Sequence, residues 1–152
     1  MSATHLLSHH AELISASAIS DEVVRARGYR TVTDKAELKA LGFGEAQRRT
    51  PALLIPVRSV TGEIATYQIR PDEPRIKDGK PLKYETPAGT RMALDIPPMA
   101  RLMLADPALP LFITEGARKA DAAVSRGLCC VALLGVWNFR GMNEHGGLTA
   151  LA

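Results

Sequence analysis

The stretch LFITEGARKA, residues 111–120, decides the fold, together with the apolar run LCCVALLG at residues 128–135. The first four residues and the apolar run predict two short strands. Residues 117–126 between them predict a helix, which Gly127 would end. A strand, a helix and a strand joined by short loops predict a βαβ unit with parallel strands and a right-handed crossover. This part of the chain is therefore predicted to be α/β.

The pattern upstream of this unit is different. LLIPV at residues 53–57 is followed by a turn signal at Thr61-Gly62, and residues 64–70 then alternate between apolar and polar side chains. This pattern predicts a half-buried antiparallel hairpin. KDGKP at residues 77–81 predicts a second turn, and the many prolines around it interrupt any long helix. Residues 51–95 are therefore expected to form a small β-rich subdomain.

Residues 1–50 are predicted to be helical. Ser20 can cap a helix that Gly28 ends, and Asp34 with Glu37 resembles a capping box. The predicted helices lie at residues 5–18, 21–27, 34–41 and 98–105. The expected fold class is α+β leading into α/β, with a helical region at 1–50, a β-rich subdomain at 51–95 and a βαβ region at 96–152.

Composition sets the class of protein. The chain has 152 residues, of which 46% are hydrophobic and 23% charged, and a formal net charge of +3. These values are typical of a globular domain with a real core, and the mild basicity permits a polyanionic partner without requiring one. No apolar run is long enough to span a membrane, and residues 1–10 are not expected to be a secretory signal. The adjacent Cys129 and Cys130 are expected to be free thiols, which favours the cytoplasm.

Glu115 is the most informative single residue. It follows a predicted strand and precedes Gly116, which opens a predicted helix. Sites form at the carboxyl ends of parallel strands, where a carboxylate can bind Mg²⁺ or transfer a proton. The alternative is an acidic residue that only stabilises a helix N-terminus, and the dipeptide alone favours this alternative. Gly116 would allow a ligand or a neighbouring backbone to approach closely.

Residues 111–120, Gly127 and VALLG at 131–135 resemble the opening of a Toprim domain, which bacterial primases share with type IA and type II topoisomerases. The resemblance implies that Glu115 is the catalytic, metal-binding glutamate of that domain. It also implies structural roles at the site for Gly116 and Gly135.

The resemblance extends upstream, to the small subdomain that precedes the Toprim domain in bacterial primases. Residues 55–57 with Gly62, then residues 68–70 and 83–87, follow the order of the motifs in that subdomain. The chain also resembles Toprim-like domains of unknown function in plasmid and phage replication proteins, including at residues 134–138 and 143–147. The similarity covers residues 51–147.

One feature of the family pattern is missing. A full Toprim domain adds a strand ending in Asp-x-Asp, which completes the Mg²⁺ site, and no Asp-x-Asp follows Glu115 in these 152 residues. Two alternatives stay open: a fragment of a longer protein, or a natural protein without two of the metal ligands. Mg²⁺ is expected only where the site is completed, with Asp121 and Glu144 as the next candidate ligands.

Basic residues suggest a nucleic-acid interface. Lys and Arg near exposed aromatic rings are typical of single-strand binding, although ordinary surface charge is the alternative. Cations in the first turn of a helix oppose its dipole, which favours a phosphate contact there. The candidate binding residues are Arg70, Lys77, Lys80, Lys83, Tyr84, Arg118 and Lys119.

The function expected from this resemblance is that of a DNA primase-like, replication-associated protein. Its partners would be single-stranded DNA or an RNA/DNA template, and a helicase or other replication proteins. The alternatives are a non-catalytic nucleic-acid or replisome interaction module and a regulatory partner-binding protein. Trp137 and Phe139 are expected to pack against the sheet, and His145 to lie in a loop. His9 and His10 lack metal-ligand spacing and are expected on the surface.

Overall fold

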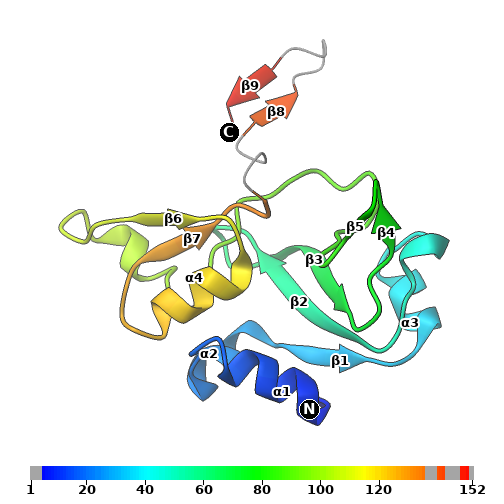
Figure 1. The fold of residues 1–152 in the computed structure, drawn as a ribbon. Helices are drawn as coiled ribbons and strands as arrows, with labels where there is room; N and C mark the ends of the chain where they lie inside the picture. Colours follow the sequence, from blue (N-terminus) through cyan, green and yellow to red (C-terminus); the bar gives the residue numbers. More distant parts are fainter. Residues whose placement is uncertain (1–4, 136–139, 143–147, 151–152) are drawn as a thin grey trace.

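A computed structural model describes residues 5–135, 140–142 and 148–150 of this mixed α/β protein (Figure 1). A three-stranded antiparallel sheet, a two-stranded parallel sheet and two small hairpins make up its strands. No helix in the described ranges has the length and apolar character needed to cross a membrane. The elements are α1 (Ser8–Ser15), α2 (Asp21–Arg27), β1 (Arg30–Val32), α3 (Lys35–Ala40), η1 (Glu45–Gln47), β2 (Ala52–Arg58), β3 (Ile64–Pro71), β4 (Ile76–Lys77), β5 (Lys80–Pro81), η2 (Met103–Ala105), β6 (Phe112–Thr114), α4 (Ala117–Val124), β7 (Cys130–Ala132), β8 (Arg140–Met142) and β9 (Leu148–Ala150).

The predicted N-terminal helices are present with their caps. The Ser20 hydroxyl accepts a hydrogen bond from the Val23 amide at 3.4 Å, and Gly28 ends α2 with a φ of 83°. Asp34 caps α3 by accepting from the Ala36 amide at 2.8 Å. Glu37, the predicted second half of a capping box, instead pairs with Arg30 of β1.

The expectation that His9 and His10 both lie on the surface is wrong for one of them. The side chain of His10 is only 2% exposed, whereas that of His9 is 52% exposed. They are neighbours in the first turn of α1, so their side chains leave the helix in different directions. His10 points towards the body of the protein.

Strand β1 is absent from the sequence-based prediction, which treated residues 1–50 as helical. It pairs antiparallel with β2, with Arg30 opposite Leu54 and Val32 opposite Ala52. A three-residue strand between two helices is too short to show an alternating pattern. The main sheet therefore combines strands from both sides of the boundary expected at residue 50.

The hairpin of β2 and β3 is confirmed, but the expectation that it is half-buried is wrong for β2. Residues 52–57 are buried on both faces of the sheet. Leu53, Ile55 and Val57 belong to one hydrophobic cluster, which also contains residues of α1, α2, α4 and β7. Ala52 and Leu54 belong to a second cluster with Leu38 of α3. Both faces are buried because the side chains of β2 alternate between these two clusters, which are formed with different helices.

The turn predicted at residues 77–81 is a tight hairpin. Asp78 and Gly79 join β4 to β5 with φ values of 51° and 74°. Two positive φ angles in a two-residue loop are typical of a type I′ turn, which favours Asp-Gly.

The helix predicted at residues 98–105 is not observed. The chain there forms a succession of turns and the three-residue 3₁₀ helix η2. The Ala100 amide bonds to Pro97 and the Met103 amide bonds to Ala100, both with three-residue spacing. The 3.2 Å bond from the Leu104 amide to Ala100 has α-helical spacing but is not continued into a helix.

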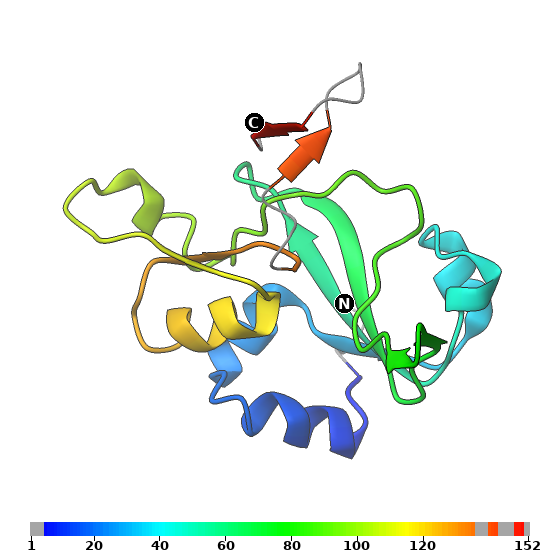
Figure 2. The ribbon, with the colours of Figure 1, turned by 45° about the horizontal axis from the view of Figure 1, so that its top comes forward.

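The βαβ unit is confirmed. Strands β6 and β7 pair in parallel, with Phe112 opposite Cys130, and α4 connects them. Figures 1 and 2 show this unit beside the three-stranded sheet, with α1 and α2 on the same side of the molecule as α4. Strand β7 is fully buried, whereas the side chains of Phe112 and Ile113 in β6 are 45% and 63% exposed. Cys129 and Cys130 are free and buried, as expected.

A buried charge network joins the three-stranded sheet to the βαβ unit. Arg27 is fully buried and donates to the Asp95 carboxylate at 2.6 and 2.9 Å, and to that of Asp121 at 2.9 and 2.7 Å. Tyr29 donates its hydroxyl proton to Asp121 at 2.6 Å, and the Arg58 amide donates to Asp95 at 3.1 Å. The network therefore connects α2, β2, the segment before η2, and α4.

The charges in this network depend on one another. Burial raises the pKa of Asp121, against the opposing effect of the Arg27 guanidinium. Burial alone would lower the pKa of Arg27, but the attraction of Asp121 and Asp95 raises it above its usual range. Asp121 is fully buried and bonded to Arg27 and Tyr29, so it is not available as the alternative metal ligand considered from sequence. Trp137, Phe139, Glu144 and His145 lie outside the described residues.

Candidate nucleic-acid interface

The structure places Glu115 at the carboxyl end of β6, immediately before α4. Its side chain is 49% exposed and forms an ion pair with Lys119, one helical turn later. Gly135 follows β7, which runs parallel to β6, so Glu115 and Gly135 both lie at the carboxyl ends of the two parallel strands. The carboxyl ends of parallel strands are where α/β proteins form their sites.

Strand β3 holds a second segment, residues 83–85, beside these strand ends. Ile69 and Glu85 exchange backbone hydrogen bonds of 2.8 and 3.0 Å, which hold residues 83–85 next to the strand. The Glu85 carboxylate anchors the segment further, accepting from Arg75 at 2.8 Å and from Gln47 at 3.2 Å. The preceding residue, Tyr84, is left exposed on the surface.

Tyr84 connects this segment to the start of α4. Its hydroxyl oxygen accepts from Arg70 at 3.1 Å and from Arg118 at 2.7 Å. The guanidinium of Arg70 also lies 5.3 Å from the centre of the Tyr84 ring, within the range of a cation–π interaction. Two predicted basic residues therefore position one predicted aromatic residue.

Arg118 is held more firmly than a free surface arginine. Besides Tyr84, its guanidinium donates to the Leu13 carbonyl at 3.1 Å and to the Ser17 hydroxyl, both in the α1 region. These contacts were not predicted, because nothing in the sequence links α1 to α4. Arg118 therefore connects α1, α4 and Tyr84. Among the residues that the structure describes around Glu115, the exposed cations are Lys83 and Lys119.

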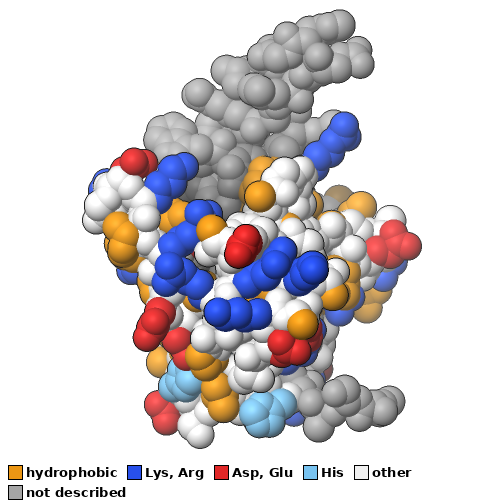
Figure 3. Space-filling view, turned by 90° about the vertical axis from the view of Figure 1, so that its right-hand side faces the viewer, with side chains coloured by type: hydrophobic (Ala, Val, Ile, Leu, Met, Phe, Trp, Pro, Cys, Tyr) orange, Lys and Arg blue, Asp and Glu red, His pale blue; other side chains and the backbone are white. Residues whose placement is uncertain are grey.

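A cavity of about 460 Å³ brings most of the predicted residues together. Figure 3 shows that Lys and Arg side chains gather on one face of the molecule. Gln68, a buried polar residue of β3, also lines the cavity and was not singled out from sequence. Lys77 and Lys80 lie on the β4–β5 hairpin and do not line it. The predicted residues that line the cavity are Lys83, Tyr84, Glu115, Gly116, Arg118, Lys119 and Gly135.

The two predicted site glycines differ in their backbone. Gly116 has a φ of −159°, an extended conformation open to any residue, and a Cβ added there would meet no atom within 4 Å. The backbone conformation and the protein's own packing therefore do not require glycine at this position, and the close approach of a ligand there stays a prediction. Gly135 has a φ of 131°, which residues with a side chain rarely adopt.

Replacing Gly116 by Val is expected to destabilise the protein by no more than about 1 kcal/mol, the cost of a poorer N-cap residue. The matched substitution Gly135→Val should cost about 1–3 kcal/mol, because it forces a β-branched residue to a positive φ. Thermal unfolding followed by circular dichroism measures both. A Gly116→Val variant that unfolds before Gly135→Val would contradict this assignment.

The described residues do not form a Mg²⁺ site around Glu115. In the parts of the chain that the structure describes, the one group of three His, Cys, Asp or Glu side chains close enough to share an ion does not include Glu115. Mg²⁺ prefers octahedral oxygen coordination and keeps several waters. A single exposed carboxylate that already pairs with Lys119 does not meet this requirement.

Sequence comparisons match only part of the chain. Residues 101–149 match a protein family described as a domain of unknown function (DUF3854). An uncharacterized protein of Picosynechococcus is 35% identical, in an alignment that covers 51% of this chain and 10% of that protein. The chain thus spans about a tenth of this relative's length.

Structural comparisons find bacterial primases. The zinc-binding and RNA polymerase domains of the Aquifex aeolicus primase give a TM-score of 0.65 at 17% identity, covering 85% of this chain and 37% of that one. The DnaG primase catalytic domain bound to ssDNA gives 0.61 at 17% identity, covering 85% and 47%. The RNA polymerase domain of the Mycobacterium tuberculosis primase, in complex with a DNA oligomer, gives 0.59 at 18% identity, covering 83% and 47%. The chain has a primase-type fold and spans less than half of each of these chains.

Proposed function

We propose that this chain belongs to a primase-like, replication-associated protein that binds single-stranded nucleic acid. The observation that carries the proposal is the cavity between residues 83–84 and the start of α4, where a carboxylate, exposed lysines and a tyrosine meet. The similarity of the fold to a primase domain that was solved with ssDNA supports this choice of ligand.

The side chains around the cavity suit a single strand. Lys83 and Lys119 are exposed and can contact successive phosphates, as nonspecific strand-binding proteins do. Tyr84 is 36% exposed, and Arg70 and Arg118 donate hydrogen bonds to its hydroxyl oxygen, so its ring can stack on a base with little loss of side-chain freedom. Phosphate contacts and base stacking together bind a strand without reading its sequence.

The reaction that we propose for such a protein is nucleotidyl transfer. Glu115 would contribute to a Mg²⁺ site only where further carboxylates complete it, and that ion would neutralise charge on the reacting phosphates. A non-catalytic module that binds a strand or a replisome partner is the second candidate. The ion pair between Glu115 and Lys119 favours this second candidate, because a Mg²⁺ site would need Glu115 to share the ion with further carboxylates.

The biological setting belongs to the proposal as well. We place the protein among plasmid or phage replication proteins, acting in the cytoplasm with a helicase or other replication proteins as partners. The free, buried thiols of Cys129 and Cys130 support a reducing compartment. The similarity of the fold to that of bacterial primases supports the link to replication.

A salt titration tests strand binding. A fluorescently labelled oligothymidine is titrated with protein at several salt concentrations, and affinity is followed by anisotropy. Replacing Lys83 and Lys119 by Ala should flatten the slope of log affinity against log salt by about 1.4, since each lost contact to a single strand removes about 0.7. Lys35 and Lys39 of α3, both exposed, provide the control, and their double Ala variant should keep the parental slope.

The same assay separates the cavity from the hairpin. Equal slopes for the cavity variant and the α3 variant would remove the cavity from the interface. A double Ala variant of Lys77 and Lys80 tests the sequence-based expectation that the β4–β5 hairpin also contacts the strand. If this variant flattens the slope, the interface extends beyond the cavity to the hairpin.

A further inference from the structure

We propose that His9 and His10 of α1, together with Asp72 directly after β3, form a binding site for a transition-metal dication such as Zn²⁺. Each residue offers one ligand atom, and the three atoms lie within 4.8 Å of one another. Two imidazoles and a carboxylate are ligands that Zn²⁺ binds well, whereas Mg²⁺ prefers oxygen alone.

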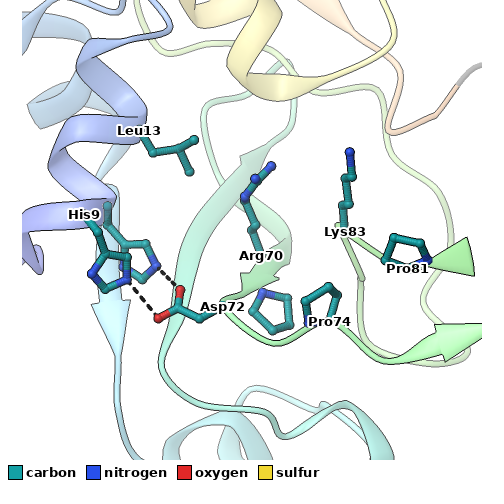
Figure 4. A pocket seen from close by; sticks show the side chains of 9 residues that line it. His9, Leu13, Arg70, Asp72, Pro74, Pro81 and Lys83 are labelled. Carbon is teal, nitrogen blue, oxygen red and sulfur yellow. Dashed lines mark hydrogen bonds and ion pairs between the residues drawn. The ribbon is translucent and has the colours of Figure 1, made fainter.

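The geometry brings residues far apart in sequence onto one carboxylate. His9 Nε2 lies 2.8 Å from one oxygen of Asp72, and His10 Nε2 lies 2.8 Å from the other. Figure 4 shows His9 reaching from α1 towards Asp72. The backbone of Asp72 is fixed by a 3.1 Å hydrogen bond from its amide to the Pro51 carbonyl. Both imidazoles therefore present the same ring nitrogen to one anchored group.

Thr31 fixes the orientation of the His10 ring. The Nδ1 atom of His10 lies 2.7 Å from the Thr31 hydroxyl, which also accepts from the Leu7 amide at 3.0 Å. Histidines that bind metals commonly hold their other nitrogen in a hydrogen bond of this kind. The Thr31 hydroxyl can donate to Nδ1 when Nε2 carries the proton. It can accept from Nδ1 when Nε2 faces a metal.

The ligand atoms are close to the separation that a metal requires. Tetrahedral Zn²⁺ with bonds of about 2.1 Å places its ligand atoms about 3.4 Å apart. With one Asp72 oxygen as the ligand, its 2.8 Å contact with the histidine that faces it would lengthen by about 0.6 Å. The other two separations, which are at most 4.8 Å, would adjust to the same value. His9 and Asp72 are 52% and 30% exposed and have room for this shift.

The site opens into a cavity of about 570 Å³, which is also lined by Arg70 and Lys83. With three protein ligands, the fourth coordination position would face this space, as in metal sites that bind water or a substrate. Figure 4 shows Arg70 and Lys83 extending beside the site. These cations suit an anionic ligand, so the chemical class we assign to the open position is a phosphate oxygen or water.

A Zn²⁺ titration of the full chain, without nucleic acid, tests the site. Isothermal calorimetry with a competing chelator should show saturable binding of about one Zn²⁺ per chain, with weaker binding of Mg²⁺. His9→Ala and Asp72→Asn should each weaken Zn²⁺ binding at least about tenfold. His5→Ala is the matched control, because His5 is an exposed histidine just before α1 and outside the cluster, and it should keep the parental affinity.

Thr31 gives a second measurement that does not remove a ligand. Thr31→Val should weaken Zn²⁺ binding about 10- to 100-fold, and Thr31→Ser, which keeps the hydroxyl, should restore it. Circular dichroism of each variant shows that the fold is kept. Absence of saturable Zn²⁺ binding, parental affinity in His9→Ala, or equal losses in His5→Ala and His9→Ala would each overturn the proposal. Because the titration contains no nucleic acid, its failure is distinguishable from failure of strand binding.

Discussion

Replacing Arg27 by Met is expected to lower the free energy of unfolding by about 3–5 kcal/mol, because it leaves the buried carboxylates of Asp95 and Asp121 without their cation. Both carboxylates are fully buried, and each receives two hydrogen bonds from Arg27. Water cannot replace these bonds without opening the contact between α2, β2 and α4. A change of this size can approach the total stability of a small domain.

Urea unfolding followed by circular dichroism measures this change. Arg25→Met in the same helix is the control. Arg25 is exposed, so its replacement should change the free energy of unfolding by less than about 0.5 kcal/mol. Asp121→Asn should resemble Arg27→Met in direction, because it leaves Arg27 with a single anionic partner. A loss below about 1 kcal/mol in Arg27→Met would mean that water solvates the network.

Replacing Ile55 by Ala is expected to lower the free energy of unfolding by about 2–5 kcal/mol. Ile55 is fully buried in β2, within the cluster that joins the three-stranded sheet to α1, α2 and α4. The cost combines lost apolar burial with a cavity that the neighbouring elements cannot fill.

Ile64→Ala provides the comparison for the same unfolding experiment. Ile64 belongs to the same hairpin but is 43% exposed, so its loss should cost well under half as much as that of Ile55. Equal losses at the two positions would show that β2 is not the centre of the core.

Local sequence patterns predicted most elements of this fold. The βαβ unit, the β2–β3 hairpin and the turn at Asp78-Gly79 each depend on residues that are close in sequence. Strand β1 could not be found in this way, because three residues carry no period. The sequence also could not show that β2 is covered on both faces, since that depends on helices docking from distant parts of the chain.

The sequence predicted which residues form the candidate interface better than it predicted the contacts between them. Lys83, Tyr84 and Glu115 were selected from sequence, and the structure places them around one cavity. The role of Arg118 as a link to α1 depends on packing between segments about a hundred residues apart. The group around Asp72 was missed for the same reason, because its two histidines are adjacent while the carboxylate is 62 residues from His10.

The central position of β2 has a consequence for the exchange of backbone amide protons with solvent. Strand β2 bonds to β1 on one side and to β3 on the other, and residues 52–57 are buried. Its amide protons can exchange only when the main sheet opens, so they should exchange at the rate set by global unfolding. Strand β6 pairs with β7 and exposes Phe112 and Ile113, so its protons should exchange through smaller local openings. In deuterated water the chain should therefore lose the protons of β6 well before those of β2.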